Sequence, residues 1–575
     1  MEARAAAHVL AEIATLRQLR GEAAEGAARF DAASRLLGTH PTRALADVIA
    51  EGDFPPDVLD VLRELAADGD SSLLDDLRED TPEGLQEMLR VPGLGPTTIQ
   101  RVHAALSIET LQELEDAVRD GRLGALPRFG PRLVERVRNG IAQLRATGAP
   151  VLLPHADAEA ARLRQEVAAT PGVSRVAVSG ALRRRAETVT ELVLVVECSG
   201  QPRDVAARLA ALRGVQRVVG GGTRTVTLHL ADSTAATLHC VHPAQFALAL
   251  LRTTGSDAHV RAVLQRLADR RFRIADDELR DAGGALLPVP DEAAVYALAG
   301  LPCIAPELRE HMGEIAAGEA NALPALLQGS DLQGVLHCHS LYSDGGFGIH
   351  DLAQAAMARG WRYLGISDHS RSALNAHGMT ADAVQQQHEE IDAVNAALDG
   401  RFRVLKGVEA DILPCGTVDF GAPLLDRFEY VIASVHTRFG LSETQMTDRV
   451  LKAMTDPHVT IIGHPTGRLL LTREPFAIDL DAVLAEAARL GVAVELNADP
   501  HRLDLDWRWC RKARDAGVAV EIGPDAHSIA GLDHVGLGVS MARKAWLSAP
   551  DVLNTRGADE VLAFARRRRV ALTAA

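Results

Sequence analysis

The stretch VLHCHSLYSDGG, residues 335–346, places His337 and His339 two positions apart within an apolar run. Alternate residues of a β-strand point to the same face, so both imidazoles are expected to reach toward one point. Asp344 adds a carboxylate from the loop that follows. Two imidazoles and a carboxylate suit a divalent cation of the Zn, Mn or Fe kind. By itself the pattern also fits an edge strand with two solvent-facing histidines, so the rest of the chain has to decide.

Seven apolar runs alternate with helical patterns from about residue 333 to the C-terminus. The runs are GVLHCHS, YLGISDHS, RVLKGVEADI, YVIASVH, VTIIGHP, AVELNA and VAVEIGPDAH. This repeated βα order predicts a parallel sheet, and this number of strands favours a barrel. In such barrels the active site forms at the carboxyl ends of the strands.

Further metal-binding side chains stand at the ends of these predicted strands. One histidine at a strand end is usually a hydrogen-bonded polar cap, but repetition along the chain is hard to explain structurally. We therefore predict a shared metal centre. Its candidate ligands are His337, His339, Asp344, His369, Glu409, His436, His464, Asp525 and His527.

Upstream, the segment LRVPGLGPTTIQRVHAAL predicts two helices joined by a turn at Gly93, Leu94 and Gly95. Glycine permits close backbone approach, and a helix N-terminus presents free N–H groups to a phosphate. The segment resembles a helix-hairpin-helix, a motif that binds the DNA backbone independently of sequence. A second copy around Gly130 keeps only one glycine, so we expect it to be weaker. The alternative is an ordinary turn between helices.

Residues 146–240 change to strand patterns, with apolar β-branched runs broken by glycine. SGALRRRAETVTELVLVV and the downstream RTTGSDAHVR resemble the palm of a family X DNA polymerase. That family holds Mg²⁺ with Asp-x-Asp and a third aspartate, whose positions here are Glu191, Val193 and Thr237, beside a retained Gly180. Valine cannot ligate a metal, so Mg²⁺ binding at the palm and polymerisation are not expected.

Two arginines follow Gly180 in the palm-like segment. Arg183 and Arg184 are candidates to hold a DNA phosphate, and a solvated basic edge is the equal alternative.

The last 240 or so residues resemble the PHP (polymerase and histidinol phosphatase) domain. HCHSLYSDG, SDHS, GVEADI, SVH, GHPTGRLL, ELNADPHRLDL and GPDAHS occur in the order of that family. A PHP domain downstream of a family X polymerase is similar to the arrangement of the bacterial PolX family. The resemblance implies three divalent ions, Mn or Zn with Fe possible. It assigns one ion to His337, His339, Glu409 and Asp525, a second to Glu409, His436 and His464, and a third to Asp344, His369 and His527.

Such a centre implies catalysis by a metal-bound water, held by the ligands, that attacks a phosphodiester in line. Asp368 is expected to support a ligand from behind. Lys406 and Arg468 are candidates to hold the substrate phosphate, although each can equally be structural. His377 and His501 are candidates for substrate contact from loops.

The chain is therefore expected to have several domains. They are an N-terminal helical domain (1–80), helix-hairpin-helix fingers (81–145), a degenerate nucleotidyltransferase-like palm (146–240), a thumb (241–325) and a PHP barrel (326–575).

The composition indicates the cellular compartment and the class of partner that fit this protein. Six scattered cysteines without a CxxC pair favour a reducing compartment, and no apolar run approaches a membrane-spanning length. We expect a cytoplasmic monomer. The net charge of −16 argues mildly against a large nucleic-acid footprint, although local basic clusters still permit DNA as the partner.

The leading hypothesis is a metal-dependent 3′–5′ DNA exonuclease of DNA repair. A phosphatase of small molecules such as histidinol phosphate is an alternative, but it has no need of a DNA-binding module. Two further alternatives are a gap-filling polymerase with residual activity through Glu191 and a DNA-binding scaffold without activity.

Overall fold

A computed structural model of the chain divides it into two units. One unit contains the N-terminal helices and the C-terminal domain, and the other contains residues 138–327 together with Ser540–Ser548. The expected boundaries near residues 80, 145, 240 and 325 stay predictions. The residues described by the structure are 3–39, 43–52, 54–67, 71–91, 94–127, 129–146, 150–212, 215–222, 224–230, 234–275, 277–373 and 376–573.

The seven strands predicted in the C-terminal domain form one parallel sheet in sequence order. A parallel bridge between Cys338 and Ala526 joins the segments beyond the two edge strands, so the sheet nearly closes into a barrel. This confirms the predicted fold. The strands are β10 Gly334–Val335, β11 Tyr363–Ile366, β12 Arg403–Asp411, β13 Tyr430–Ser434, β14 Val459–Ile462, β15 Ala493–Asn497 and β16 Val520–Gly523.

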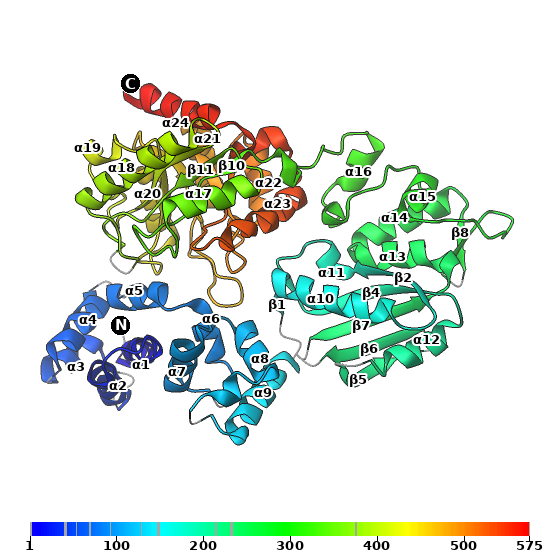
Figure 1. Ribbon diagram of the computed structural model, residues 1–575, viewed down its shortest axis with the longest axis horizontal. Helices are drawn as coiled ribbons and strands as arrows, with labels where there is room; N and C mark the ends of the chain where they lie inside the picture. The colour runs from blue at the N-terminus through cyan, green and yellow to red at the C-terminus, as the bar shows by residue number, and fades with distance from the viewer. Residues whose placement is uncertain are drawn as a thin grey trace. The chain divides into compact units, whose positions relative to one another are not determined.

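Helices follow the strands and surround the barrel (Figure 1). Apolar residues at helical spacing, such as Leu480, Val483, Leu484 and Ala487, are buried on the side of the helix that packs against the domain. The helices are α17 Ile349–Ala358, α18 Ala381–Leu398, α19 Ala422–Leu425, α20 Glu443–Met454, α21 Leu480–Leu490, α22 Trp507–Asp515, α23 Val535–Lys544 and α24 Ala558–Thr573.

The interior of the barrel is filled by side chains rather than by a channel. Tyr430 is fully buried, and its hydroxyl donates to the Leu336 carbonyl at 2.5 Å. Gly365 and Gly407 leave room for this ring, because a Cβ at either position would lie 2.3 or 2.1 Å from a Tyr430 atom. The filled interior leaves the rim at the carboxyl ends of the strands as the place for a site.

The second unit contains a five-stranded mixed sheet in the order β2-β4-β7-β6-β5, with β4 and β7 parallel (Figure 1). Its strands are β2 Val173–Ser179, β4 Glu191–Cys198, β5 Val215–Gly221, β6 Thr225–Leu230 and β7 Ala235–Val241. Its helices are α10 Leu153–Ala168, α11 Gly180–Arg183, α12 Pro202–Leu209, α13 Phe246–Thr254, α14 Asp257–Asp269, α15 Glu292–Leu298 and α16 Glu314–Glu319. Two small antiparallel pairs add β1 Val151–Leu152 with β3 Thr188–Val189, and β8 Arg273–Ala275 with β9 Glu278–Arg280.

The N-terminal segment is helical, as its apolar spacing predicts. Leu10, Ile13 and Leu16 lie on one buried face of α1. The helices are α1 Ala3–Leu19, α2 Ala24–Gly38, α3 Leu45–Glu51, α4 Pro56–Ala67, α5 Ser72–Asp80, α6 Glu83–Met88, α7 Pro96–Leu106, α8 Leu111–Arg119 and α9 Pro131–Ala146.

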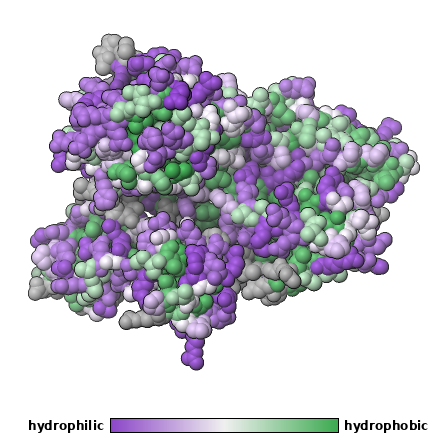
Figure 2. Space-filling view, viewed as in Figure 1, coloured by the Kyte–Doolittle hydropathy of each residue, from purple (hydrophilic) through white to green (hydrophobic). Residues whose placement is uncertain are grey.

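The surface is mostly hydrophilic on the face seen in Figure 2, with small separate hydrophobic areas. Among the described residues, no helix is both long enough and apolar enough to span a bilayer.

Candidate metal centre

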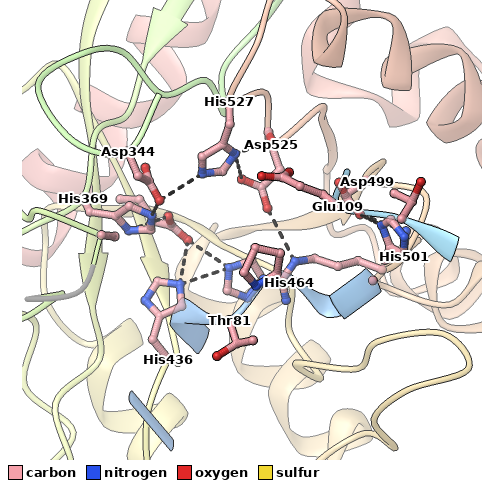
Figure 3. Close-up of a pocket in the computed structure, with 16 residues that line it drawn as sticks. Thr81, Glu109, Asp344, His369, His436, His464, Asp499, His501, Asp525 and His527 are labelled. Atoms are coloured by element: carbon pink, nitrogen blue, oxygen red, sulfur yellow. Dashed lines mark hydrogen bonds and ion pairs between the residues drawn. The ribbon is translucent and has the colours of Figure 1, made fainter. Parts of the chain in front are cut away.

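All nine predicted ligands lie at the carboxyl ends of the barrel strands. Parallel strands bring these ends to one rim, so residues far apart in the sequence converge there (Figure 3). They are His337 and His339 beyond β10, Asp344 in the loop before α17, His369 beyond β11, Glu409 on β12, His436 beyond β13, His464 beyond β14, and Asp525 and His527 beyond β16.

The His-x-His pair does not lie within a regular strand, because β10 already ends at Val335. The chain nevertheless stays extended: the His339 N–H donates to the Ala526 carbonyl at 2.9 Å, and the Ala526 N–H donates to the His337 carbonyl at 3.2 Å. This ladder keeps both imidazoles on one face, as the alternation predicts.

Glu409 stands at the centre of the cluster. Its Oε2 lies 3.3 Å from His337 Nε2 and 3.1 Å from His369 Nδ1. Its Oε1 lies 3.2 Å from His436 Nε2 and 2.9 Å from His464 Nε2. One carboxylate therefore faces four imidazoles, which is the arrangement expected of a bridging ligand.

Asp525 and Asp344 face the histidines from the other side of the cluster. Asp525 Oδ1 lies 3.2 Å from His339 Nε2. Asp344 Oδ2 lies 3.6 Å from His369 Nε2 and 3.3 Å from His527 Nε2 (Figure 3). The side chains of Asp344 and His527 are 32% and 42% exposed, whereas the other seven ligands are buried. The cluster is therefore open to solvent on the side of Asp344 and His527.

Three groups of ligand atoms are each close enough to hold one ion, with all atoms of a group within 4.8 Å of one another. His339 and His369 each belong to two of these groups and His464 belongs to none of them, which differs from the expected assignment of each of these residues to one ion. The groups are His339, Asp344, His369 and His527; His337, His339 and Asp525; and His369, Glu409 and His436.

Buried histidine nitrogens without a hydrogen-bond partner support metal binding. In the described part of the chain they include His337 Nε2, His369 Nδ1, His464 Nδ1 and both ring nitrogens of His339. A buried polar atom without a partner is costly, and a metal ion supplies the missing interaction. The residues present therefore fit divalent ions.

Two buried carboxylates that the sequence analysis missed hold the histidines from behind. Glu495 lies 2.5 Å from His337 Nδ1, and Asp411 lies 2.6 Å from His436 Nδ1. A carboxylate on one ring nitrogen fixes the tautomer and directs the other nitrogen to a metal. The spacing offered a signal for Asp411, which follows Glu409 by two positions on β12 and so shares its face.

The charges of the cluster shift its proton equilibria. Burial alone would lower the pKa of His337, but Glu495, Asp525 and Glu409 together hold that pKa well above its usual value. Burial and the charge of Arg502 instead lower the pKa of His464 to about 3. Ions that bind at His337 therefore have to displace a proton, so metal affinity falls with acidification.

Asp368 supports the loop that carries Asp344. This buried carboxylate accepts hydrogen bonds from the Ser340 N–H at 2.6 Å, the Ser343 hydroxyl at 2.6 Å and the Gln387 amide at 2.7 Å. Its supporting role is therefore exerted through the loop rather than on a ligand side chain.

The two predicted phosphate-binding residues are engaged elsewhere. Lys406 pairs with Asp392 at 2.6 Å, on the side of β12 opposite to Glu409. Arg468 is buried and donates to the carbonyls of Arg502 and Leu503. These positions argue against direct substrate contact by either residue, because both side chains serve local structure.

An exposed arginine that the sequence analysis did not single out follows a candidate ligand closely in the sequence. Arg371 follows the ligand His369 by two residues, and its side chain has no hydrogen bond or ion pair to any described residue. Of the two predicted loop histidines, His501 lies in the same pocket as the ligands, and His377 adopts a φ of 55° in its loop.

The two helix-hairpin-helix turns have the same backbone hydrogen bonds. The N–H groups of Leu94 and Phe129 donate to residues three positions earlier, and Gly95 and Gly130 each precede a helix that begins with proline. The expectation that the second copy is the weaker one is therefore not supported by its geometry. Gly93 lies outside the described residues.

Arg183 and Arg184 are held by carboxylates within the second unit. Arg183 pairs with Glu292 at 2.5 Å, and Arg184 pairs with Glu310 at 2.9 Å. Both arginines also donate to Thr254. These ion pairs argue against the alternative interpretation of the two arginines as a solvated basic edge. A DNA phosphate would have to compete with the ion pairs in order to bind here.

The three palm positions lie together, as the family pattern requires. Val193 of β4 is in register with Thr237 of β7, and the Thr237 hydroxyl donates to Glu191. A Cβ at Gly180, whose φ is 66°, would meet Val193. One carboxylate, one hydroxyl and one apolar side chain make a poor site for Mg²⁺.

Three family models match successive segments of the chain. Residues 85–142 match the SAM-like helix-hairpin-helix tandem family, residues 249–310 the DNA polymerase beta thumb and residues 336–498 the PHP domain. The tandem match covers both hairpins.

One relative matches most of the chain, and others match about a third of it. The DNA polymerase/3′-5′ exonuclease PolX of Bacillus subtilis (strain 168) is 34% identical over 510 residues, which cover 88% of this chain and 89% of that protein. A probable phosphatase of Syntrophotalea carbinolica is 33% identical over 166 residues, covering 28% of this chain and 64% of that protein. A probable phosphatase of Serratia proteamaculans is 30% identical over 212 residues, which cover 35% of this chain and 81% of that protein.

Proposed function

The chain belongs to the PolX family, and we propose that its PHP domain is a metal-dependent 3′–5′ exonuclease that acts on DNA in repair. The observation that carries this proposal is the convergence of nine candidate ligands on one rim, eight of them in groups that could hold an ion, with buried imidazole nitrogens that lack partners among the described residues. The relative that spans most of the chain is itself named a 3′-5′ exonuclease.

We propose three divalent ions, Mn or Zn with Fe possible, because imidazole-rich sites favour these metals over Mg. When bound, such ions supply a water of lowered pKa and positive charge for the phosphate. The protein holds the imidazoles in place through Glu495 and Asp411, and Glu409 faces the histidines of two groups. Arg371, which is exposed and follows His369 by two residues, is a candidate to hold the substrate phosphate.

DNA is held, in this proposal, by the paired hairpins around Gly95 and Gly130. A Cβ at either glycine would meet no atom within 4 Å, so the start of each following helix is open to a phosphate. The palm is not expected to polymerise, because Glu191 is the single carboxylate at its three metal positions.

The double variant His339→Ala with Glu409→Ala tests the assignment. Loss of two ligands shared by several ions should reduce hydrolysis of 3′-labelled single-stranded DNA by at least about a thousandfold. DNA binding, measured by fluorescence anisotropy, should stay within about twofold, because the hairpins are untouched. Persistent cleavage by this variant would show that the site is elsewhere.

A phosphatase acting on small molecules is the second candidate, since two relatives are named probable phosphatases and match 28% and 35% of this chain. Incubation of the full chain with Mn²⁺ and either labelled DNA or histidinol phosphate separates the two activities. Turnover of histidinol phosphate with intact DNA would favour the phosphatase. Absence of tightly bound metal and of both activities would favour a scaffold.

A further inference from the structure

The loop between β10 and α17 exposes two large apolar side chains next to a metal ligand. Leu341 is 66% exposed and Phe347 is 37% exposed, and each is three residues from Asp344. Seven large hydrophobic side chains are exposed in the described part of the chain, and these are the two that belong to the C-terminal domain. Single exposed hydrophobic residues need no explanation, but two on one short loop at a candidate active site do.

The loop is fixed, so these side chains are not exposed through looseness. The buried carboxylate of Asp368 accepts from the Ser340 N–H and hydroxyl and from the Ser343 hydroxyl, all within 2.6 Å. Tyr342 turns the other way and donates to Glu390 at 2.9 Å. The neighbouring polar side chains are thus all engaged, which leaves Leu341 to face solvent.

The backbone of the loop lies directly against two of the ligand-bearing segments. The Gly346 N–H donates to the His527 carbonyl at 2.8 Å, and a Cβ at Gly345 would lie 2.3 Å from the His339 carbonyl oxygen. The Leu341 N–H donates to the Phe347 carbonyl at 3.1 Å, which makes these two residues neighbours across the loop. The apolar pair is therefore held at the exposed side of the cluster, where Asp344 and His527 face solvent.

We propose that Leu341 and Phe347 form a platform on which an unpaired base of the DNA strand being cut rests. This inference depends on the proposed exonuclease function. The cluster attracts the phosphate through charge, and the nucleotide next to that phosphate brings an apolar base face that an aromatic and an aliphatic side chain can cover.

The platform selects a class of substrate rather than a sequence. Every base has a π-face, so stacking tolerates all four bases. A base within a duplex is already stacked between its neighbours, so the platform favours a single-stranded or frayed 3′ end. A 3′ end without a base should bind less well, although its phosphates are intact.

Two single-stranded oligonucleotides test the platform on the full chain with Mn²⁺. One carries normal nucleotides at its last two 3′ positions, and the other carries abasic tetrahydrofuran residues there. For the unaltered protein, the KM of the abasic substrate should be higher by about tenfold. In the double variant Leu341→Ser with Phe347→Ser, the KM of the normal substrate should rise to that of the abasic one, so that both are cut alike.

A binding measurement gives a second readout that needs no cleavage. An oligonucleotide with a 2-aminopurine base at its 3′ end and cleavage-resistant phosphorothioate linkages, mixed with the full chain and Mn²⁺, should lose fluorescence on stacking, and the double variant should abolish this loss. The single variant Phe347→Tyr keeps the aromatic ring and should show the same loss of fluorescence as the unaltered protein. Leu286→Ser, an exposed leucine of the second unit, is the matched control and should leave the discrimination intact.

The outcomes separate this inference from the proposed function. Cleavage of neither oligonucleotide by the unaltered protein would overturn the exonuclease. Cleavage of normal DNA with the same base discrimination in the double variant would overturn the platform alone. A lowered Tm of the double variant with intact discrimination would show that the two side chains pack against the protein, which also overturns the platform.

Discussion

At the scale of single residues, Glu495 is expected to be as important for metal affinity as a ligand. It is fully buried and lies 2.5 Å from His337 Nδ1. Glu495→Gln keeps the shape but removes the negative charge behind the imidazole, so metal affinity should fall about 10- to 100-fold. Competition with a chromogenic chelator, followed by metal analysis of the dialysed protein, measures this loss.

Glu521→Gln is the matched control for that substitution. Glu521 is also fully buried, and burial together with the charge of Glu495 raises its pKa to about 8. At pH 7 this carboxyl is mostly protonated, so the uncharged amide resembles the state already present. Equal losses of metal in the two variants would mean that packing, rather than the charge behind His337, sets the affinity.

The residue scale also shows what the sequence can predict. All nine candidate ligands could be proposed from the sequence because they stand at or near the ends of apolar runs, and a barrel brings strand ends together. Glu495 was missed because it lies within the run AVELN, where its role depends on a neighbouring segment 158 positions earlier. Arg371 was missed because an exposed arginine is ordinary until its partners are known to be absent among the described residues.

At the scale of elements, the two hairpins are expected to contribute equally to DNA binding. Gly95 is the N-cap of α7, and Gly130 precedes α9. Aspartate at either position is a good helix cap, yet its charge would repel a phosphate. Gly95→Asp and Gly130→Asp should each weaken DNA binding about tenfold without lowering Tm, and should reduce the salt slope of binding by about one.

Neutral caps separate charge from shape in that experiment. Gly95→Asn and Gly130→Asn add a similar side chain without charge, so DNA affinity should change little. An effect of Gly95→Asp alone would restore the interpretation of the second hairpin as the weaker copy. The sequence analysis compared the two copies by their glycines, whereas the structure shows that they share a buried Leu94 or Phe129 and a glycine before the helix.

At the scale of the whole molecule, the chain combines a cluster of nine candidate metal ligands with a palm-like site in which Glu191 is the single carboxylate at the three metal positions. The second unit keeps the sheet of the palm and the fold of the thumb, including the ion pairs from Arg183 to Glu292 and from Arg184 to Glu310. The fold could be predicted from the strand patterns, but these ion pairs could not, because their partners are more than 100 positions apart.

The lost carboxylates make a prediction about restoring metal binding to the palm. Val193 and Thr237 are in register on neighbouring parallel strands, and Glu191 contacts Thr237. Val193→Asp with Thr237→Asp, made in the His339→Ala and Glu409→Ala background, would gather three carboxylates. Their mutual repulsion should lower Tm without metal, and Mg²⁺ should raise it again, because the ion binds only the folded site.

The parent variant with an unaltered palm should show no such response to Mg²⁺, and primer extension by the unaltered chain should yield no product. Template-directed incorporation by the unaltered chain would mean that Glu191 alone can hold the catalytic ion. The same Mg²⁺ dependence of Tm in the parent variant would mean that the unaltered palm already binds Mg²⁺. Valine at position 193 would then not prevent metal binding there.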